Sequence, residues 1–370
     1  MGRAQYLESQ RVAVVYGTAN AAYRYRCLHL QEQLHLLGFE AAVRPYYALT
    51  AEEARDAALL VLHRLPLDRR LARLLAERQR AGLPALYDTD DLTFDPALSV
   101  QVPGLRAAGR VRTALYADEL RRQGEMLARC DGALVSTAYL ATRVCAAGRP
   151  AHVHRNAFSA GMLAAAQAAR RERDEGDGRF IIGYASGTPT HDRDFALIAE
   201  ALREVLACQT MAELWVIGSV AIGGGWEPFT SRVRRLPAVP WQRLPALLAQ
   251  LDVNLAPLEL DNPLCRAKSE IKWLEAGLVG VPTIASAAEA YLHAIEPGRN
   301  GLLAATAEEW QQALLRLADD TGYRRMLGVQ AQADVLARYH PMVRARELAA
   351  TLDRVAADGG MAGRVWSTSS

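Results

Sequence analysis

The sequence predicts an α/β protein built from two Rossmann-like, doubly wound parallel-sheet domains. Short apolar strands alternate with helical patterns along the chain, and the strands lead into loops of small or polar residues. Residues 171–179, almost wholly charged or glycine, interrupt this alternation and mark a domain boundary. At 370 residues, two domains of ordinary size are expected. Ligands of such folds bind outside the carboxyl ends of the strands, so a cleft between two facing domains is the expected site.

The N-terminal domain is predicted over residues 1–158. It opens with an apolar strand at 11–16, a glycine-containing loop and a helical pattern at 23–37, which is how a doubly wound unit begins. The remaining strands are predicted at 41–46, 59–63, 83–87, 132–136 and 151–154, and the remaining helices at 67–81, 114–129 and 139–147.

The second domain is predicted over residues 172–340, preceded by an alanine-rich helix at 160–171. A final helix at 341–357 is expected to pack back on the N-terminal domain. Strands of the second domain are predicted at 180–184, 213–217, 251–258 and 283–285, and helices at 194–206, 241–249, 270–278, 307–318 and 323–339.

Composition excludes several classes of protein. A net charge of +2 argues against a general nucleic-acid binder, and no apolar run reaches the roughly 18 residues that a membrane-spanning helix needs. The N-terminus lacks the pattern of a secretion signal. Five scattered cysteines form no CxxC pair, so neither a zinc site nor a disulfide framework is indicated, and we expect a cytoplasmic protein.

The chain contains only two lysines, Lys268 and Lys272, among 43 basic residues. Lysine concentrates its charge at one point where arginine offers a planar fork, so the choice indicates that a compact ammonium is needed. Ser269 is a candidate N-cap for a helix at 270–278, and the i, i+4 spacing would place both lysines on one helix face.

Arg266, Lys268 and the free backbone N–H groups are therefore expected to converge at one helix N-terminus, which is a favourable site for phosphate. Glu275, one turn beyond Lys272, could accept hydrogen bonds from sugar hydroxyls. The alternative is a surface helix with i, i+4 charge pairs.

A second candidate site is the loop that leaves the strand at 180–184. Ser186, Gly187 and Thr188 would let backbone and hydroxyl groups approach a phosphate closely. The loop matches neither the dinucleotide fingerprint nor the P-loop, so an ordinary strand-to-helix loop is the alternative.

Asp88 and Asp90 follow the strand at 83–87 in a D-x-D arrangement. Carboxylates at the end of a strand can hold a divalent metal on a nucleotide sugar. They can equally cap a helix and brace the loop. We expect no metal, because the Lys/Arg cluster already offers the neutralisation that a metal would supply.

Three further basic features were candidates in the N-terminal half. His63 ends a strand and could bind substrate or act as acid or base, although a structural role is the alternative. Arg24 and Arg26 could hold an acceptor or phosphate, or lie on a solvated helix face. An arginine-rich helix could contact an anionic membrane or simply be solvated, through Arg69, Arg70, Arg73, Arg78 and Arg80.

Several runs of residues occur together in a familiar order. These are LHRLP (62–66), LYDTDDLTFDP (86–96), STAYLA (136–141), HRNAFS (154–159), GYASGTPTHDRDF (183–195), DVNLAPLELDNPLCRAKSEIKWLEAGLVGVPTIAS (252–286) and GRNGLL (298–303). The chain resembles bacterial glycosyltransferases of the GT-B fold, in the large retaining family four (group 1), and most closely the polysaccharide-biosynthesis branch with its KS-x-x-K-x-x-E helix. The resemblance covers nearly the whole chain.

The resemblance implies a nucleotide-diphosphate sugar held by the C-terminal half, without cofactor or metal. Glu275 matches the family glutamate that holds the nucleotide ribose, whereas the first motif glutamate is replaced by Ala267. Arg266 and Lys268 would take the diphosphate, and His63 would lie near the sugar. Asn156 matches an interdomain position.

The acceptor side would include Gly17 and Thr18, the short first loop, with Arg24 and Asp90. The implied reaction is transfer of a sugar to a hydroxyl acceptor (a glycan, a lipid-linked or a small molecule) with retention. Peripheral contact with the inner face of the membrane is a further expectation. Two alternatives stay open: a nucleotide-sugar 2-epimerase of the same fold, and a non-catalytic nucleotide-sugar binding protein.

Overall fold

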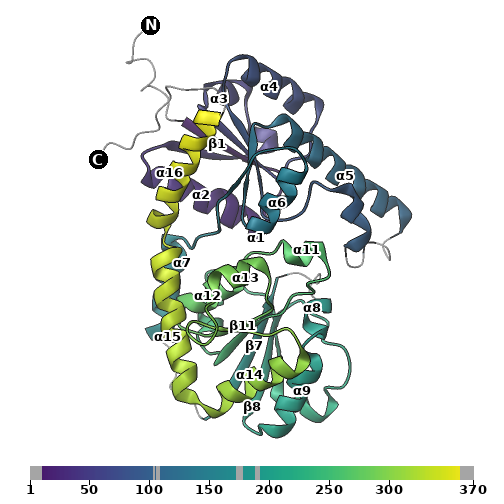
Figure 1. Cartoon of the computed structure of the whole chain (residues 1–370), viewed down its shortest axis with the longest axis vertical. Coiled ribbons are helices and arrows are strands. Elements are labelled where there is room, and N and C mark those ends of the chain that lie inside the picture. The colour runs from purple at the N-terminus through teal and green to yellow at the C-terminus, as the bar shows by residue number, and fades with distance from the viewer. Residues whose placement is uncertain (1–10, 103–104, 106–108, 172–177, 188–191, 359–370) are drawn as a thin grey trace. The chain divides into compact units, whose positions relative to one another are not determined.

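The computed structural model describes residues 11–102, 105, 109–171, 178–187 and 192–358. The chain forms two compact units, shown in Figure 1. The first unit comprises Met1–Ala157 together with His340–Ser370, and the second comprises Phe158–Tyr339.

The first unit is built on a six-stranded parallel sheet in the order β2-β1-β3-β4-β5-β6. This is a doubly wound order, whose direction reverses between β1 and β3. Its strands are β1 (Arg11–Tyr16), β2 (Glu40–Pro45), β3 (Leu59–His63), β4 (Ala85–Thr89), β5 (Gly132–Val135) and β6 (Ala151–Val153). Its helices are α1 (Ala21–Tyr23), η2 (Arg24–Leu28), α2 (His29–Leu36), η3 (Tyr46–Ala48), α3 (Ala51–Asp56), α4 (Arg69–Arg80), η4 (Pro96–Gln101), α5 (Arg110–Arg129), α6 (Ala138–Ala146) and α16 (Pro341–Asp358).

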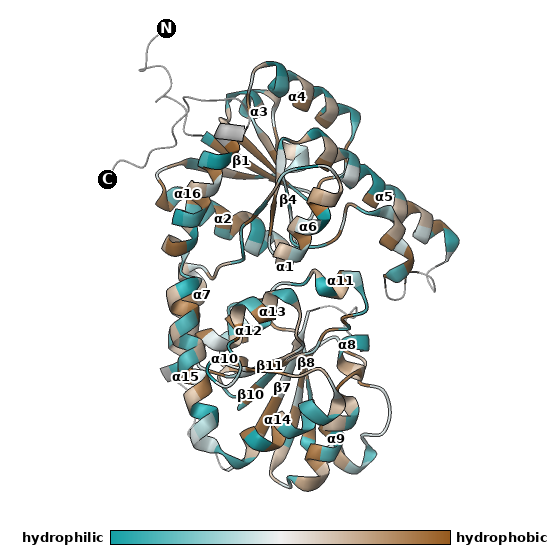
Figure 2. Cartoon of the chain, in the orientation of Figure 1, coloured by the Kyte–Doolittle hydropathy of each residue, from teal (hydrophilic) through white to brown (hydrophobic). Residues whose placement is uncertain are grey.

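Every residue of β3 and β4 is buried, as expected for central strands covered by helices on both faces. Figure 2 shows the apolar colour concentrated in the strands of each sheet. Helix α16 packs on α2, and its Leu348, Leu352 and Val355 join the core around Val12 and Val14. The end of the chain therefore completes the core of the first unit.

The second unit carries another six-stranded parallel sheet, β9-β8-β7-β10-β11-β12. Numbered within the unit this order is 3-2-1-4-5-6, the dinucleotide-binding arrangement that reverses between β7 and β10. Its strands are β7 (Phe180–Ser186), β8 (Ala212–Gly218), β9 (Val233–Leu236), β10 (Val253–Ala256), β11 (Thr283–Ala285) and β12 (Leu302–Leu303). Its helices are α7 (Ala160–Arg171), α8 (Asp192–Ala196), α9 (Ala199–Cys208), η6 (Glu227–Arg232), α10 (Leu244–Leu248), α11 (Pro263–Arg266), α12 (Ile271–Leu278), α13 (Glu289–Ala294), α14 (Ala307–Asp319) and α15 (Thr321–Arg338).

The two doubly wound α/β folds agree with the predicted fold class. Three local differences matter for the site. Strand β4 continues to Thr89, so Asp88 lies in the strand and not in a loop. Strand β7 continues to Ser186. Helix α12 begins at Ile271, with Glu270 and not Ser269 in the N-cap position.

Candidate functional site

Each sheet has one position where the strand order reverses, and loops from the two flanking strands diverge there to form a crevice. In the second unit this position lies outside the carboxyl ends of β7 and β10, where Ser186 and Ala256 end their strands. In the first unit it lies outside β1 and β3, whose last residues Tyr16 and His63 are paired in register. Most of the predicted site residues follow one of these four strand ends.

The loop after β7 starts from a tightly packed turn. Ser186 is buried and pairs with Gly218, the last residue of β8. A Cβ on Gly218 would lie 2.0 Å from the carbonyl oxygen of Ser186, and its φ of 97° favours glycine. Gly187 is exposed, with open space where a Cβ would be, so a ligand could approach its backbone closely. Thr188 lies outside the described residues.

Lys272 projects from the first turn of α12 onto β7. Its Nζ is 4.1 Å from the centre of the Tyr184 ring, and the atom is buried. No described residue accepts a hydrogen bond from it. Burial lowers the pKa of Lys272 to about 8, the nearby Asp194 and Glu275 oppose this, and the charge of Lys268 adds to it. A buried ammonium with a second ammonium nearby and without a hydrogen-bond acceptor is a favourable environment for a multivalent anion.

Asp194 is a buried site residue that the sequence analysis did not select. It lies in α8, and its Oδ1 accepts a hydrogen bond of 2.8 Å from the backbone N–H of Glu259, in the loop after β10. The Sγ of Cys265 lies 3.5 Å from the same oxygen. Asp194 thus joins the loops from the two strands that flank the reversal. The run HDRD at residues 191–194, with two aspartates in four residues, was the sequence feature that could have pointed to this residue.

Lys268 and Arg266 lie differently from their predicted positions. Arg266 ends the short helix α11 and is exposed, and Lys268, half-buried, lies in the link between α11 and α12. The two lysines therefore do not share a face of one helix, and Ser269 is not the N-cap of α12. The prediction of one helix that Ser269 caps and whose face carries both lysines is wrong, because Pro263 starts a separate helix and Lys268 lies in the link that follows it. Convergence of Arg266 and Lys268 on a phosphate stays a prediction.

Glu275 lies half-buried one turn after Lys272 on α12. The two side chains are three residues apart on the helix, and the charge of Glu275 raises the pKa of Lys272. Ala267, at the position of the family's first motif glutamate, is fully buried. This position supplies no carboxylate to a bound sugar.

In the first unit, His63 belongs to a buried ionic network. Its Nδ1 lies 2.7 Å from Oδ1 of Asp88, and Arg26 donates to both oxygens of Asp88 at 3.2 and 2.6 Å. Arg26 also donates to the carbonyl of His154 and to Oδ1 of Asn156. Burial raises the pKa of Asp88, but the charge of Arg26 and the bond to His63 outweigh it and hold that pKa at about 2. Because Nδ1 is engaged, Nε2 is the atom of His63 with which a substrate could interact.

The first helix of the chain contains a π-helical turn, η2, which brings Arg26 into the interior. Such turns are frequent at functional sites. Arg24 is half-buried, with its guanidinium 4.7 Å from the centre of the Tyr25 ring. Arg26 therefore does not lie on a solvated helix face. Gly17 and Thr18 are exposed in the loop after β1, and Gly17 lies against Leu65 in the loop after β3.

Asp90 pairs with Arg64 at 2.6 Å, which links the loops after β3 and β4. Arg64 has a φ of 47°, the only positive φ of a non-glycine residue in the described part of the chain. With Asp88 bound by Arg26 and His63, the two aspartates serve different partners. Among the residues that the structure describes, no three His, Cys, Asp or Glu side chains are grouped as a metal site requires.

The arginines of α4 differ in burial and in their hydrogen bonds. Arg78 is buried and donates to the carbonyls of Ala54, Ala57 and Pro84. Arg70 donates to the carbonyl of Leu49. Of the five arginines only Arg78 is thus withdrawn from the solvated or membrane-facing face, because Arg69, Arg70, Arg73 and Arg80 are exposed. No helix in the described ranges is long and apolar enough to span a bilayer.

Comparison with known proteins now adds to this geometry. Residues 196–350 match a family model described as glycosyl transferase-like. No curated protein sequence matches. Among solved structures, HepE from Anabaena in complex with UDP and glucose is similar over 93% of this chain and 99% of its own, with 16% identity and a TM-score of 0.61.

Sucrose-phosphate synthase from Thermosynechococcus elongatus is similar over 94% of this chain and 99% of its own, with 15% identity and a TM-score of 0.61. A candidate UDP-N-acetylglucosamine 2-epimerase from Listeria monocytogenes is similar over 94% and 96%, with 15% identity and a TM-score of 0.51. At these identities the likeness shows the fold.

The two doubly wound sheets define the GT-B class of fold. Residues 196–350, which match the glycosyl transferase-like family model, lie mainly in the second unit and include α12 and the loop after β10.

Proposed function

We propose that the protein is a glycosyltransferase that moves a sugar from a nucleotide-diphosphate sugar to a hydroxyl acceptor, with retention of anomeric configuration and without a metal ion. The observation that carries the proposal is the buried ammonium of Lys272, which has no hydrogen-bond acceptor among the described residues and lies beside β7 at the reversal of strand order. A diphosphate would supply the missing acceptor oxygens.

In the proposed reaction, the bond between the anomeric carbon and the diphosphate oxygen breaks, and its electron pair leaves with the diphosphate. The acceptor hydroxyl attacks the same face of the sugar, and its proton passes to an oxygen of the leaving phosphate. Negative charge grows on the diphosphate, where Lys268 and Arg266 would stabilise it. A charge pair about 4 Å apart is worth roughly 4 kcal/mol at an effective dielectric of 20.

The remaining residues would position the substrates. Ser186, Gly187 and Ser269 would contact the phosphates, Lys272 would hold the diphosphate, and Glu275 would bind the nucleotide ribose. Asp194 would keep the loops after β7 and β10 together. Thr188, outside the described residues, remains a proposed donor contact.

On the acceptor side, His63 is proposed to contact the reacting sugar through Nε2, with Nδ1 fixed by Asp88. Gly17 and Thr18 would line the approach of the acceptor because they lie at the strand-order reversal of the first sheet. Arg24 is proposed as a further acceptor contact. Asp90 would act through Arg64 by fixing the loop that follows His63.

We further propose that the protein acts in the cytoplasm, in contact with the inner face of the membrane, on a glycan, a lipid-linked or a small-molecule acceptor. The five cysteines are all free thiols, which fits a reducing compartment. The similar HepE structure is a complex with UDP, so uridine-diphosphate sugars are the first donors to test.

A thermal-shift screen with nucleotide diphosphates and their sugars tests donor binding, because a ligand that binds only the native state raises the melting temperature. We expect one nucleoside diphosphate to raise it in the wild type and to raise it less in Lys272→Met. The proposal fails if no nucleoside diphosphate changes the melting temperature of the wild type.

Each of two competing functions is supported by one specific observation. The Listeria candidate epimerase has a similar fold, and an epimerase would convert the donor with no acceptor present. The buried Ala267 in place of a glutamate favours a non-catalytic binding protein. Incubation of the donor with and without pooled acceptors separates them: epimerisation without acceptor supports the first, and binding with no conversion supports the second.

A further inference from the structure

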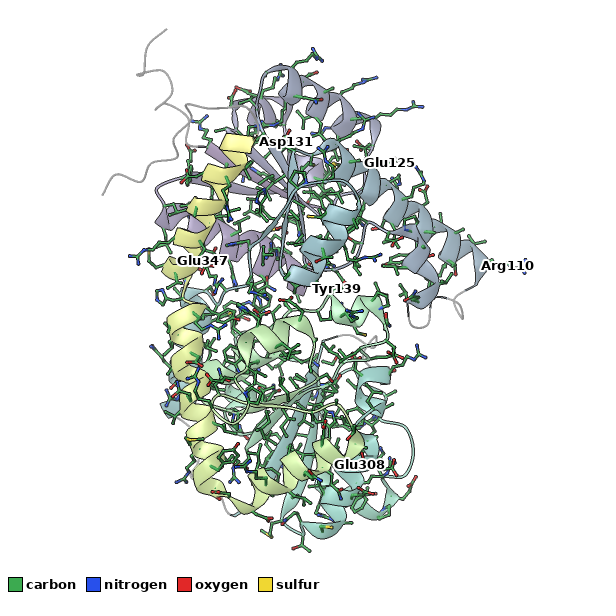
Figure 3. All side chains as sticks on the ribbon, in the orientation of Figure 1. Arg110, Glu125, Asp131, Tyr139, Glu308 and Glu347 are labelled. Atoms are coloured by element: carbon green, nitrogen blue, oxygen red, sulfur yellow. The ribbon has the colours of Figure 1, made fainter. Side chains whose placement is uncertain are left out.

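Helix α5 carries an exposed apolar stripe at its N-terminal end. Val111 is 74% exposed and Leu115 is 66% exposed. They are four residues apart, so they lie on one face of the helix. Figure 1 shows this end of α5 projecting beyond the sheet of the first unit, and Figure 3 places Arg110 at its tip.

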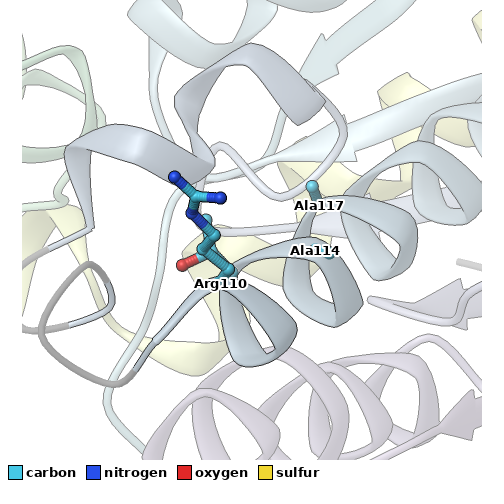
Figure 4. A pocket seen from close by; sticks show the side chains of 4 residues that line it. Arg110, Ala114 and Ala117 are labelled. Atoms are coloured by element: carbon cyan, nitrogen blue, oxygen red, sulfur yellow. The ribbon is translucent and has the colours of Figure 1, made fainter.

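The stripe lies between two arginines. At about 100° per residue, Ala114, Val111 and Leu115 form a continuous apolar band, with Arg110 on one edge and Arg112 on the other. Figure 4 shows Arg110, Ala114 and Ala117 following one another along one edge of the helix, where they line a shallow hollow together with Thr113.

The two arginines are unneutralised, unlike those farther along the helix. Arg121 and Arg122 pair with Asp118, and Arg121 also pairs with Glu125. By contrast, the described residues provide no ion pair for Arg110 or Arg112. The first two turns thus carry an uncompensated positive charge that ends at Asp118.

This charge opposes the stability of the helix itself. Cations are unfavourable at a helix N-terminus, where the backbone dipole is positive. The first turn of α5 contains no acidic residue, and its N-cap, Gly109, provides no side-chain cap. An anionic partner outside the helix would offset this unfavourable charge.

We propose that the first two turns of α5 bind an anionic phospholipid surface, with Val111 and Leu115 entering the interface and Arg110 and Arg112 contacting lipid phosphates. This apolar band with arginine edges is the pattern of an interfacial helix. A protein partner would require about 800 Å² on each side, which two exposed turns do not offer. This surface rests on the membrane contact proposed above. Its test measures binding to vesicles and not sugar transfer, so a negative result would leave the proposed transferase activity untouched.

The experiment measures co-sedimentation of the full chain with vesicles of phosphatidylcholine containing about one third phosphatidylglycerol. Binding is expected at low salt and is expected to be absent with pure phosphatidylcholine. Replacing both apolar residues, Val111→Gln with Leu115→Gln, should weaken partitioning at least about 10-fold. Removing both charges, Arg110→Gln with Arg112→Gln, should weaken it about 30-fold.

Matched controls replace exposed residues on other helices. Val329 on α15 is 66% exposed and Met326 is 46% exposed, so Val329→Gln with Met326→Gln removes a comparable apolar pair. Arg325→Gln with Arg346→Gln removes the same charge from α15 and α16. Neither control should change vesicle binding, and all variants should keep the wild-type melting temperature because the positions are exposed.

Two results would overturn the assignment. One is vesicle binding that is absent in the wild type or unchanged in both α5 variants. The other is a change of oligomeric state in the apolar α5 variant with vesicle binding retained, because the stripe would then be an interface between copies of the chain.

Discussion

The Nζ of Lys272 lies 4.1 Å from the centre of the Tyr184 ring, so a helix and the first strand of the second sheet hold an ammonium against an aromatic face. A cation–π contact offsets only part of the cost of burying that charge. The side chain is therefore kept in a costly state in the free protein, and a bound anion would relieve it.

Donor binding should accordingly weaken at alkaline pH. The pKa of Lys272 is lowered to about 8, so the ammonium is charged at neutral pH and loses its proton above pH 8. We expect the affinity for a nucleoside diphosphate to fall by up to about tenfold per pH unit above pH 8. Calorimetric titration at neutral and alkaline pH measures this. In Lys272→Met the affinity should be lower and independent of pH over this range. If the affinity of this variant fell with pH as steeply as that of the wild type, Lys272 would not be the group that binds the diphosphate.

Lys272→Met should also stabilise the donor-free protein. The folded chain holds a proton on Lys272 at neutral pH although its pKa has dropped from 10.5 to about 8, which costs up to about 3 kcal/mol. An apolar side chain of similar length removes this cost. The free energy of unfolding of the wild type should rise from about pH 8 to 10.5, because the unfolded chain binds more protons than the folded chain in this range. That of Lys272→Met should not rise. Chemical denaturation of both proteins gives the comparison.

Lys268→Ala should slow transfer about 10²–10³-fold at saturating donor, because a preorganised charge on the leaving group is lost. Lys268→Arg should recover little of this rate, since a planar guanidinium does not replace a compact ammonium. The melting temperature should be unchanged, as the side chain is only half-buried. Full turnover in the alanine variant would remove Lys268 from the mechanism.

Asp88→Asn should destabilise the first unit by about 3–5 kcal/mol, because Arg26 would retain a buried charge without its partner. The pKa of Asp88 is lowered from 3.8 to about 2, so its contribution is complete above pH 4 and is lost as the pH falls towards 2. Wild-type stability should fall in this window, and the variant should lose less. Asp118→Asn, which breaks an exposed pair on α5, is the control and should leave the acid unfolding profile unchanged.

Two glycine substitutions separate packing from ligand approach. Gly218→Ala should destabilise the second unit, since the new Cβ would lie 2.0 Å from the carbonyl oxygen of Ser186. Gly187→Ala meets nothing within 4 Å, so the melting temperature should hold while donor affinity falls if phosphate contacts this backbone. Unchanged donor affinity in Gly187→Ala would show that the phosphates bind elsewhere.

The fold was predictable from sequence because buried parallel strands are short continuous apolar runs. The bounds of β1 and β3 were predicted to the residue, and the start of β11 was predicted correctly. Strand β9 was missed because its sequence, VRRL, has two exposed arginines and lies at the edge of the sheet. The short helix α11 was missed because Pro263 starts it inside a stretch that was read as a loop.

The site was less predictable than the fold. The sequence selected Lys272 because lysine is rare in this chain. It did not predict the contact of Lys272 with the Tyr184 ring, which depends on how α12 packs against β10 and β11 of the second sheet. Asp194 was missed because its role, a bond to the backbone of Glu259, joins residues 65 positions apart. The pairing of Arg26 with Asp88 depends on the π-helical turn, which periodicity analysis does not detect.

The return of α16 to the first unit has a consequence for biosynthesis. Leu348, Leu352 and Val355 fill the core beside Val12 and Val14, yet they are translated only after the whole second unit. The N-terminal sheet therefore lacks the cover of α16 while the entire second unit is translated. The unit that is translated first therefore completes its core only after the second unit has been made.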